Sequence, residues 1–230
     1  MRIPNNIIEI NQKDKTWRKQ LIAVKNKYIF YNEKDELINP FFHEIFEQYL
    51  TYKWIKPDDI ILELGARYGI VSCSVNQMLN NKKNHVVVEP DKSVHSVLSQ
   101  NKKNCNAKFT ICKNPISNIP LEFINIKQYG LASYTKETTN IKKQINITFD
   151  EFIKKYKLKF NVLIIDCEGC LCNFLIECPR EMMKNINCII FEKDNEKLCN
   201  YEAIVYIKLK ELKFSKVDTL LNDFQQVWTR

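Results

Sequence analysis

Acidic residues occur where four apolar runs of the sequence end, and carboxylates in such positions can do chemistry together. They are Glu63, Glu89, Asp166 with Glu168, and Glu192. If the apolar runs are parallel strands, their carboxyl ends meet at one edge of the sheet, where open α/β sheets bind ligands. A fifth run ends at Lys113-Asn114 and would reach the same edge. The spacing therefore predicts one acidic site at that edge.

A glycine loop stands beside the first of these carboxylates. In "ILELGARYGIVS", residues 60–71, Gly65 and Gly69 are two of only four glycines in the chain. The pattern E-x-G-x-x-x-G has Ala66 and Arg67 where a dinucleotide-binding loop would have its second glycine. Such a loop suits a nucleoside without a pyrophosphate, and we expect S-adenosylmethionine with its methionine end over the turn. We also expect a side chain at Gly65 to block the cofactor while leaving the fold intact.

The predicted cofactor contacts extend from this loop to the neighbouring strand ends. Glu89 follows the loop by about twenty residues, the separation at which an acidic side chain accepts the hydroxyls of a ribose. The alternative for Glu89 is a surface carboxylate at a helix N-terminus, which the helix dipole favours. The predicted cofactor-binding residues are Glu63, Gly65, Ala66, Arg67, Tyr68, Gly69, Glu89, Pro90, Asn114 and Asp166.

Strands that alternate with helices must position these residues. Strands are expected over 60–64, 85–89, 108–112, 162–166, 188–192, 215–219 and 225–229. Helices are expected over 39–55, after residue 69, and over 91–101, 148–158 and 200–212. Thr148 and Glu151 have the spacing of a capping box. The pattern predicts an α/β fold with a seven-stranded, mostly parallel sheet, an antiparallel last strand and helices on both faces.

Length and composition indicate a single globular domain. We expect residues 1–40 to be an N-terminal extension with a hairpin around residues 25–27, and residues 41–230 to form the core. No apolar stretch approaches the roughly 20 residues that span a membrane, and the start of the chain does not resemble a signal peptide. We therefore expect a cytoplasmic protein whose nine cysteines are reduced. The segment 118–143 is the expected source of substrate contacts.

Four blocks of the sequence occur in a characteristic order. They are "ILELGARYG", then "VVVEPD" with the later Asn101 and Asn104, then "ITFDEFIKKYKLKFNVLIIDCEGC", and finally "IIFEKD". Together they resemble the FkbM-like methyltransferases, S-adenosylmethionine-dependent enzymes of the Rossmann-like class I. Glu63 stands where the family usually has an aspartate, and Leu171 stands where it usually has a second glutamate. The resemblance covers roughly residues 41–214 and implies O-methylation of a sugar, a glycan precursor or a related small molecule.

The two carboxylates that follow the fourth strand are the expected catalytic residues. A hydroxyl acceptor must lose its proton during methyl transfer, so a base within hydrogen-bond reach helps. We expect Asp166 to be this base, or to orient the hydroxyl, with Glu168 in support. Capping of the next helix is the alternative for Glu168. Asp166, Glu168 and Glu192 could instead hold Mg²⁺, but we favour no metal because Leu171 removes one potential ligand.

Three other functions fit parts of the sequence. Zinc binding by Cys167, Cys170, Cys172 and Cys178 is disfavoured because these residues do not form two separated pairs on loops. The net charge of +8 suggests a ribose 2′-O-methyltransferase of RNA, but the lysine clusters at 82–83, 102–103 and 154–159 precede strands, opposite the expected site. A non-catalytic module that binds S-adenosylmethionine is the last alternative.

His43 could reach the site, although a surface position suits it better. The oligomeric state does not follow from the sequence.

Overall fold

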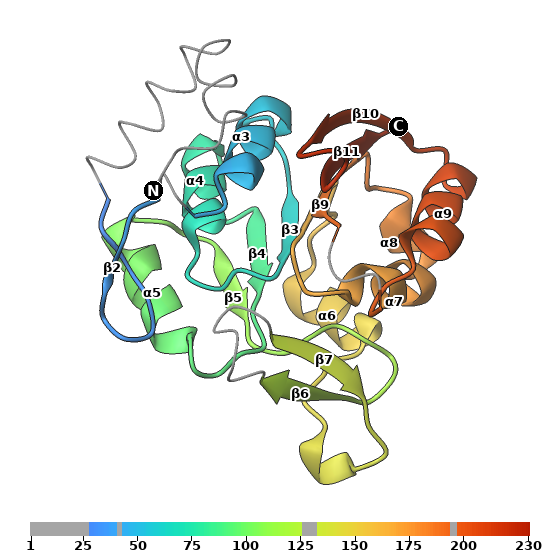
Figure 1. The fold of residues 1–230 in the computed structure, drawn as a ribbon, viewed down its shortest axis with the longest axis horizontal. Helices are drawn as coiled ribbons and strands as arrows, with labels where there is room; N and C mark the ends of the chain where they lie inside the picture. Colours follow the sequence, from blue (N-terminus) through green and yellow to red (C-terminus); the bar gives the residue numbers. More distant parts are fainter. Residues whose placement is uncertain (1–27, 41–42, 126–132, 194–196) are drawn as a thin grey trace.

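The structure is a computed structural model that describes residues 28–40, 43–125, 133–193 and 197–230. Its centre is a seven-stranded sheet in the order β10-β11-β9-β8-β3-β4-β5 (Figure 1). The strands are β3 (Ile61–Leu64), β4 (His85–Val88), β5 (Thr110–Cys112), β8 (Val162–Ile165), β9 (Cys188–Glu192), β10 (Ser215–Leu220) and β11 (Gln225–Thr229). The five strands from β9 to β5 are parallel, whereas β11 runs antiparallel to β9 and to β10. The predicted fold class is confirmed.

Helices cover both faces of this sheet because its strands are apolar on both sides. Leu62 and Leu163 face the layer of α6 (Phe149–Tyr156), α7 (Cys170–Glu177), α8 (Arg180–Met183) and α9 (Tyr206–Glu211). Their neighbours Ile61 and Val162 face α3 (Ile45–Trp54) and α4 (Ile70–Met78). The remaining helix, α5 (His95–Asn104), packs beside α4 on the same face as α3. This alternation is the period of two that a strand imposes on its side chains.

Two small hairpins lie outside the main sheet. The first pairs β1 (Phe30–Tyr31) with β2 (Leu37–Ile38), whereas the hairpin expected around residues 25–27 lies outside the described residues. The second pairs β6 (Leu121–Asn125) with β7 (Ser133–Glu137) and projects from the sheet edge in Figure 1. This hairpin lies within residues 118–143, for which the sequence predicted neither a helix nor a strand.

Local signals in the sequence are reproduced unevenly. Thr148 and Glu151 form the expected capping box at the start of α6. The helix expected over 200–212 begins instead as a π-helical turn, Tyr201–Val205, and continues as α9. In the described parts of the chain, no helix combines the length and the apolar character that crossing a bilayer requires.

The cysteines differ from the prediction of nine reduced thiols. Disulfides join Cys167 to Cys170 and Cys172 to Cys199. The other five cysteines are buried free thiols. The sequence pattern concealed these pairs because three of the four cysteines belong to one short segment, while Cys199 approaches it only through the packing of the π-helical turn against α7. Disulfides are typical of oxidising compartments, whereas reduced thiols were expected from the cytoplasmic location, so that location stays a prediction.

Candidate functional site

A cavity of about 930 Å³ opens at the carboxyl edge of the parallel strands. This volume is near the upper end of the range of about 300–1,000 Å³ for ligand pockets. Seven of the predicted site residues line it: Gly65, Arg67, Tyr68, Glu89, Pro90, Asp166 and Glu168. The hairpin β6–β7 supplies a further wall with Phe123 and Tyr134, so the segment expected to contact the substrate does reach the cavity.

The glycine loop passes from β3 into α4 with an unusual backbone. Gly65 and Gly69 have φ values of +87° and +76°, and Arg67 between them has a φ of +43°. These left-handed conformations favour glycine, which explains why a glycine-poor chain has two glycines here. A side chain at Gly65 would meet the main chain of Asp166, so the expectation that it would spare the fold is wrong.

Glu89 is positioned beneath this loop by main-chain donors. Its Oε2 accepts the N–H groups of Arg67 at 2.7 Å and Ala66 at 3.3 Å, and its Oε1 accepts that of Asp91 at 2.8 Å. Burial raises the pKa of Glu89, while the N–H groups of Asp91 and Arg67 oppose that rise. A carboxylate offers about four acceptor positions, so one position remains for a ligand hydroxyl after these three bonds. The alternative of a surface carboxylate does not describe this buried side chain.

Arg67 and Tyr68 link the loop to the first hairpin. The Arg67 guanidinium lies over the Tyr68 ring, 5.0 Å from its centre, and 3.8 Å from Asp91. The Tyr68 hydroxyl donates to Glu33, which follows β1. Asn101 of α5 donates to the main-chain oxygens of Tyr31 and Tyr68. The loop is therefore held by the first hairpin and by α5.

Four predicted cofactor-binding residues support the cavity without lining it: Glu63, Ala66, Gly69 and Asn114. Glu63 is 2% exposed and accepts the Ser72 hydroxyl at 2.5 Å, and its other oxygen lies 2.8 Å from Nε2 of His85. Asn114 donates its amide to the main-chain oxygen of Ile145. In this geometry they position the strand ends, and their contact with a cofactor stays a prediction.

One wall of the cavity is strongly acidic. Its carboxylates belong to Glu44, Glu47, Asp166, Glu168 and Glu192. Burial and the nearby charge of Glu63 raise the pKa of Glu44 to about 8. Burial, a hydrogen bond shared with Glu192 and the charge of Asp166 raise the pKa of Glu47 well above its ordinary value. Burial and the charge of Glu192 raise that of Glu168. The wall is therefore suited to hold protons or a cation.

Three residues at this wall were missed by the sequence analysis: Glu44, Glu47 and Gln225. The sequence pattern puts Glu47 on the polar face of an amphipathic helix. In the structure its side chain is 6% exposed and faces the cavity from α3. Gln225 reads as an ordinary residue of a last strand, yet it is 3% exposed and lies at the start of β11. None of the three follows the carboxyl end of a parallel strand, and this was the criterion that identified the other residues. His43 also lines the cavity and is half-buried.

Comparison with known proteins supports the fold and goes no further. No protein-family model and no curated protein matches the sequence. An O-methyltransferase from Bacillus cereus, solved in complex with SAH, superposes with a TM-score of 0.52 at 12% identity over 96% of each chain. A candidate RNA methyltransferase from Pyrococcus horikoshii gives 0.50 at 13% identity over 93% of this chain and 96% of its own. The chain has the Rossmann-like class I methyltransferase fold. The closer resemblance to the FkbM-like family stays a prediction.

Proposed function

We propose that this protein transfers a methyl group from S-adenosylmethionine to a hydroxyl of a sugar, a glycan precursor or a related small molecule. The observation that carries the proposal is that Glu89, Gly65 of the glycine loop and Asp166 line one cavity at the carboxyl edge of the sheet. The four sequence blocks that resemble FkbM-like enzymes support a place in that family. The fold and the solved structures that share it support the cofactor.

The cofactor side of the cavity fits a nucleoside with a methionine tail. The turn at Gly65 brings bare main chain to the cavity wall and packs it against the main chain of Asp166, where a Cβ would not fit. The free acceptor position of Glu89 suits a ribose hydroxyl. S-adenosylmethionine would supply an electrophilic methyl group at this place. The residues of the chain contribute mostly by positioning, since the transfer is an in-line displacement.

The acceptor side of the cavity has features that suit a neutral hydroxyl compound. Phe123 and Tyr134 of the hairpin β6–β7 offer apolar surface to the cavity. Asp166 follows the central strand β8 and lines the cavity, and we assign it the role of orienting the hydroxyl and receiving its proton, with Glu168 two residues later in support. These are the roles that the sequence predicted for the two carboxylates.

Methylation of RNA is the alternative that the acidic wall disfavours. Seven acidic residues line the cavity against three that are lysine or arginine, so a phosphate backbone would be repelled from it. The lysines of 102–103 and 154–155 lie at the last turns of α5 and α6, which precede strands and are remote from the carboxyl edge.

Calorimetry and a product assay test the proposal. The full chain should bind S-adenosylmethionine and its demethylated product, and should methylate at least one member of a panel of sugars and nucleotide sugars. Capped RNA belongs in the same panel as the competing acceptor. Absence of cofactor binding by folded protein would refute the proposal, and methylation of RNA alone would replace the acceptor class.

A further inference from the structure

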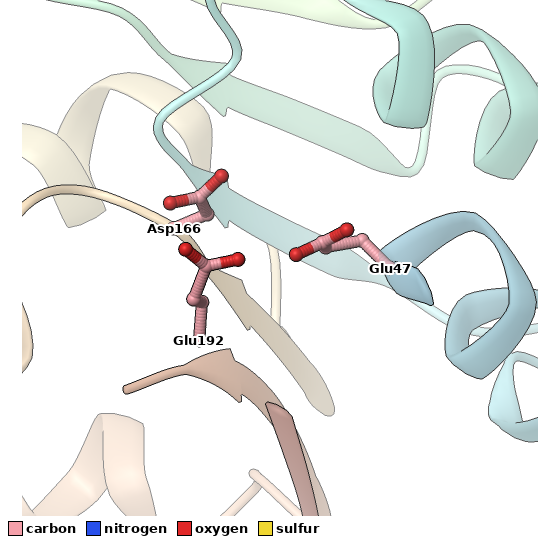
Figure 2. A group of neighbouring side chains, drawn as sticks. All are labelled: Glu47, Asp166 and Glu192. Atoms are coloured by element: carbon pink, nitrogen blue, oxygen red, sulfur yellow. The ribbon is translucent and has the colours of Figure 1, made fainter. Parts of the chain in front are cut away.

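Three carboxylates from distant parts of the chain converge on the floor of the cavity. Figure 2 shows Glu47 from α3, Asp166 after β8 and Glu192 at the end of β9, with their oxygens directed toward one another. One oxygen of each lies within 4.8 Å of the other two. Three negative charges at this separation repel one another unless protons or a cation lie between them.

A buried amide beside the three carboxylates is a second, independent observation. The side chain of Gln225 is directed at them, since its Nε2 donates to Glu47 and, at 3.0 Å, to Glu192. Its Oε1 is buried and has no hydrogen-bond partner among the described residues. Buried amide oxygens are rarely left in that state. The oxygen and nitrogen of an amide have the same shape, so a turn of the amide would direct Oε1 at the carboxylates instead.

We propose that Glu47, Asp166, Glu192 and the amide oxygen of Gln225 bind one divalent cation. Carboxylate and amide oxygens are the ligands of hard cations such as Mg²⁺, Mn²⁺ and Ca²⁺. Of the soft ligands near the site, Cys167 and Cys170 are joined in a disulfide. The cation would satisfy the amide oxygen and offset the repulsion of the carboxylates in one arrangement.

This site differs from the one that the sequence suggested and did not favour. The structure replaces Glu168 by Glu47 and adds Gln225, neither of which the sequence analysis considered. Leu171 therefore does not bear on the number of ligands. The role of the cation rests on the proposed function, because a bound cation stabilises the oxyanion of an acceptor hydroxyl as it does that of water. Cation binding itself does not depend on that function.

Binding of Mn²⁺ to the full chain tests the proposal. The protein is first treated with EDTA to remove bound metal, and Mn²⁺ binding is then followed by electron paramagnetic resonance. We expect one bound Mn²⁺ per chain, displaced by Mg²⁺ or Ca²⁺. Glu47→Gln should weaken this binding at least about tenfold, because a charged ligand is lost. Glu168→Gln is the matched control, since Glu168 lines the same cavity outside the cluster. The Mn²⁺ affinity of this variant should stay within about threefold of the wild-type value.

Two outcomes would overturn the cation site. One is folded wild-type protein that binds no Mn²⁺, and this needs no variant. The other is Glu168→Gln weakening Mn²⁺ as much as Glu47→Gln does, with circular dichroism showing both folded. Asp166→Asn replaces Glu47→Gln if the latter does not fold. Calorimetry with S-adenosylmethionine on the EDTA-treated protein separates the two proposals, because cofactor binding without Mn²⁺ binding refutes the cation site alone.

Discussion

The main-chain oxygen of Asp166 occupies the place where Gly65 would carry a side chain. A Cβ built on Gly65 would lie 1.6 Å from that oxygen. The two residues follow the adjacent parallel strands β3 and β8, and the N–H of Asp166 donates to Leu64 at 2.9 Å. The glycine thus lets the loop of the expected cofactor site and the expected catalytic carboxylate approach each other.

Gly65→Ala should destabilise the fold itself. The methyl group must displace the main chain, so we expect a loss of at least about 3 kcal/mol from overpacking and the positive φ together. Gly69→Ala is the control, because the first atom its Cβ would meet is the movable Cδ1 of Leu98 at 2.6 Å. Urea unfolding measures both losses. A smaller loss for Gly65→Ala than for Gly69→Ala would contradict this reading of the loop.

Glu89→Gln should weaken S-adenosylmethionine without unfolding the protein. Replacing the carboxylate removes charge-assisted hydrogen bonds to the ribose and to the loop, each on the order of 1.5–3 kcal/mol, so affinity should fall roughly tenfold or more. Glu211→Gln, at an exposed carboxylate on α9, is the control. Titration calorimetry provides the measurement, and equal affinities in the two variants would remove Glu89 from the cofactor site.

Asp166→Asn should reduce turnover about 100-fold or more while cofactor affinity is nearly kept. The amide retains size and hydrogen bonding but neither receives the hydroxyl proton nor carries a ligand charge. Single-turnover kinetics on an identified acceptor, with calorimetry for the cofactor, separates the two effects. Full activity in the variant would mean that positioning alone accounts for the reaction.

Stability should fall as the pH rises from about 5 to 8. The pKa of Glu44 is about 8 in the folded protein and near 4.5 when exposed, so the folded state holds a proton that the unfolded state has lost in this window. The stabilisation is complete below pH 4.5 and disappears as the pH passes 8. Glu44→Gln should flatten the decline by more than about 1 kcal/mol, the equivalent of one pKa unit. Urea unfolding in EDTA across this range measures it, and an unchanged slope would contradict the assignment.

Alkylation of the denatured, unreduced protein should label five cysteines of the nine. Mass spectrometry gives the count directly, and nine labels would restore the reduced protein that the sequence suggested. Cys199→Ser should cost about 3–4 kcal/mol, because the Cys172–Cys199 disulfide closes a segment with a sequence separation of 27. Cys178→Ser, at a buried free thiol, is the control for the loss of a sulfur atom.

The sequence predicted the sheet well because buried parallel strands are short apolar runs with few alternatives. Its boundaries were least accurate at β5, an edge strand that begins at Thr110, two residues later than expected. The acidic residues that follow strands were found because the topology of such sheets brings those ends together. Glu47 and Gln225 reach the same place from a helix and an antiparallel strand, and tertiary packing alone brings them there. Cys199, the disulfide partner of Cys172 in α7, was missed for the same reason.

The hydrogen bond between Gln225 and Glu47 joins residues 178 positions apart. Closing so long a segment is entropically unfavourable until the intervening strands have paired. A partly folded chain can therefore contain the glycine loop and Glu89, which lie close in sequence, before it contains the acidic floor of the cavity. Arrival of the final strand beside α3 is then the step that completes the site during folding, and Mn²⁺ added in a refolding experiment would bind only after it.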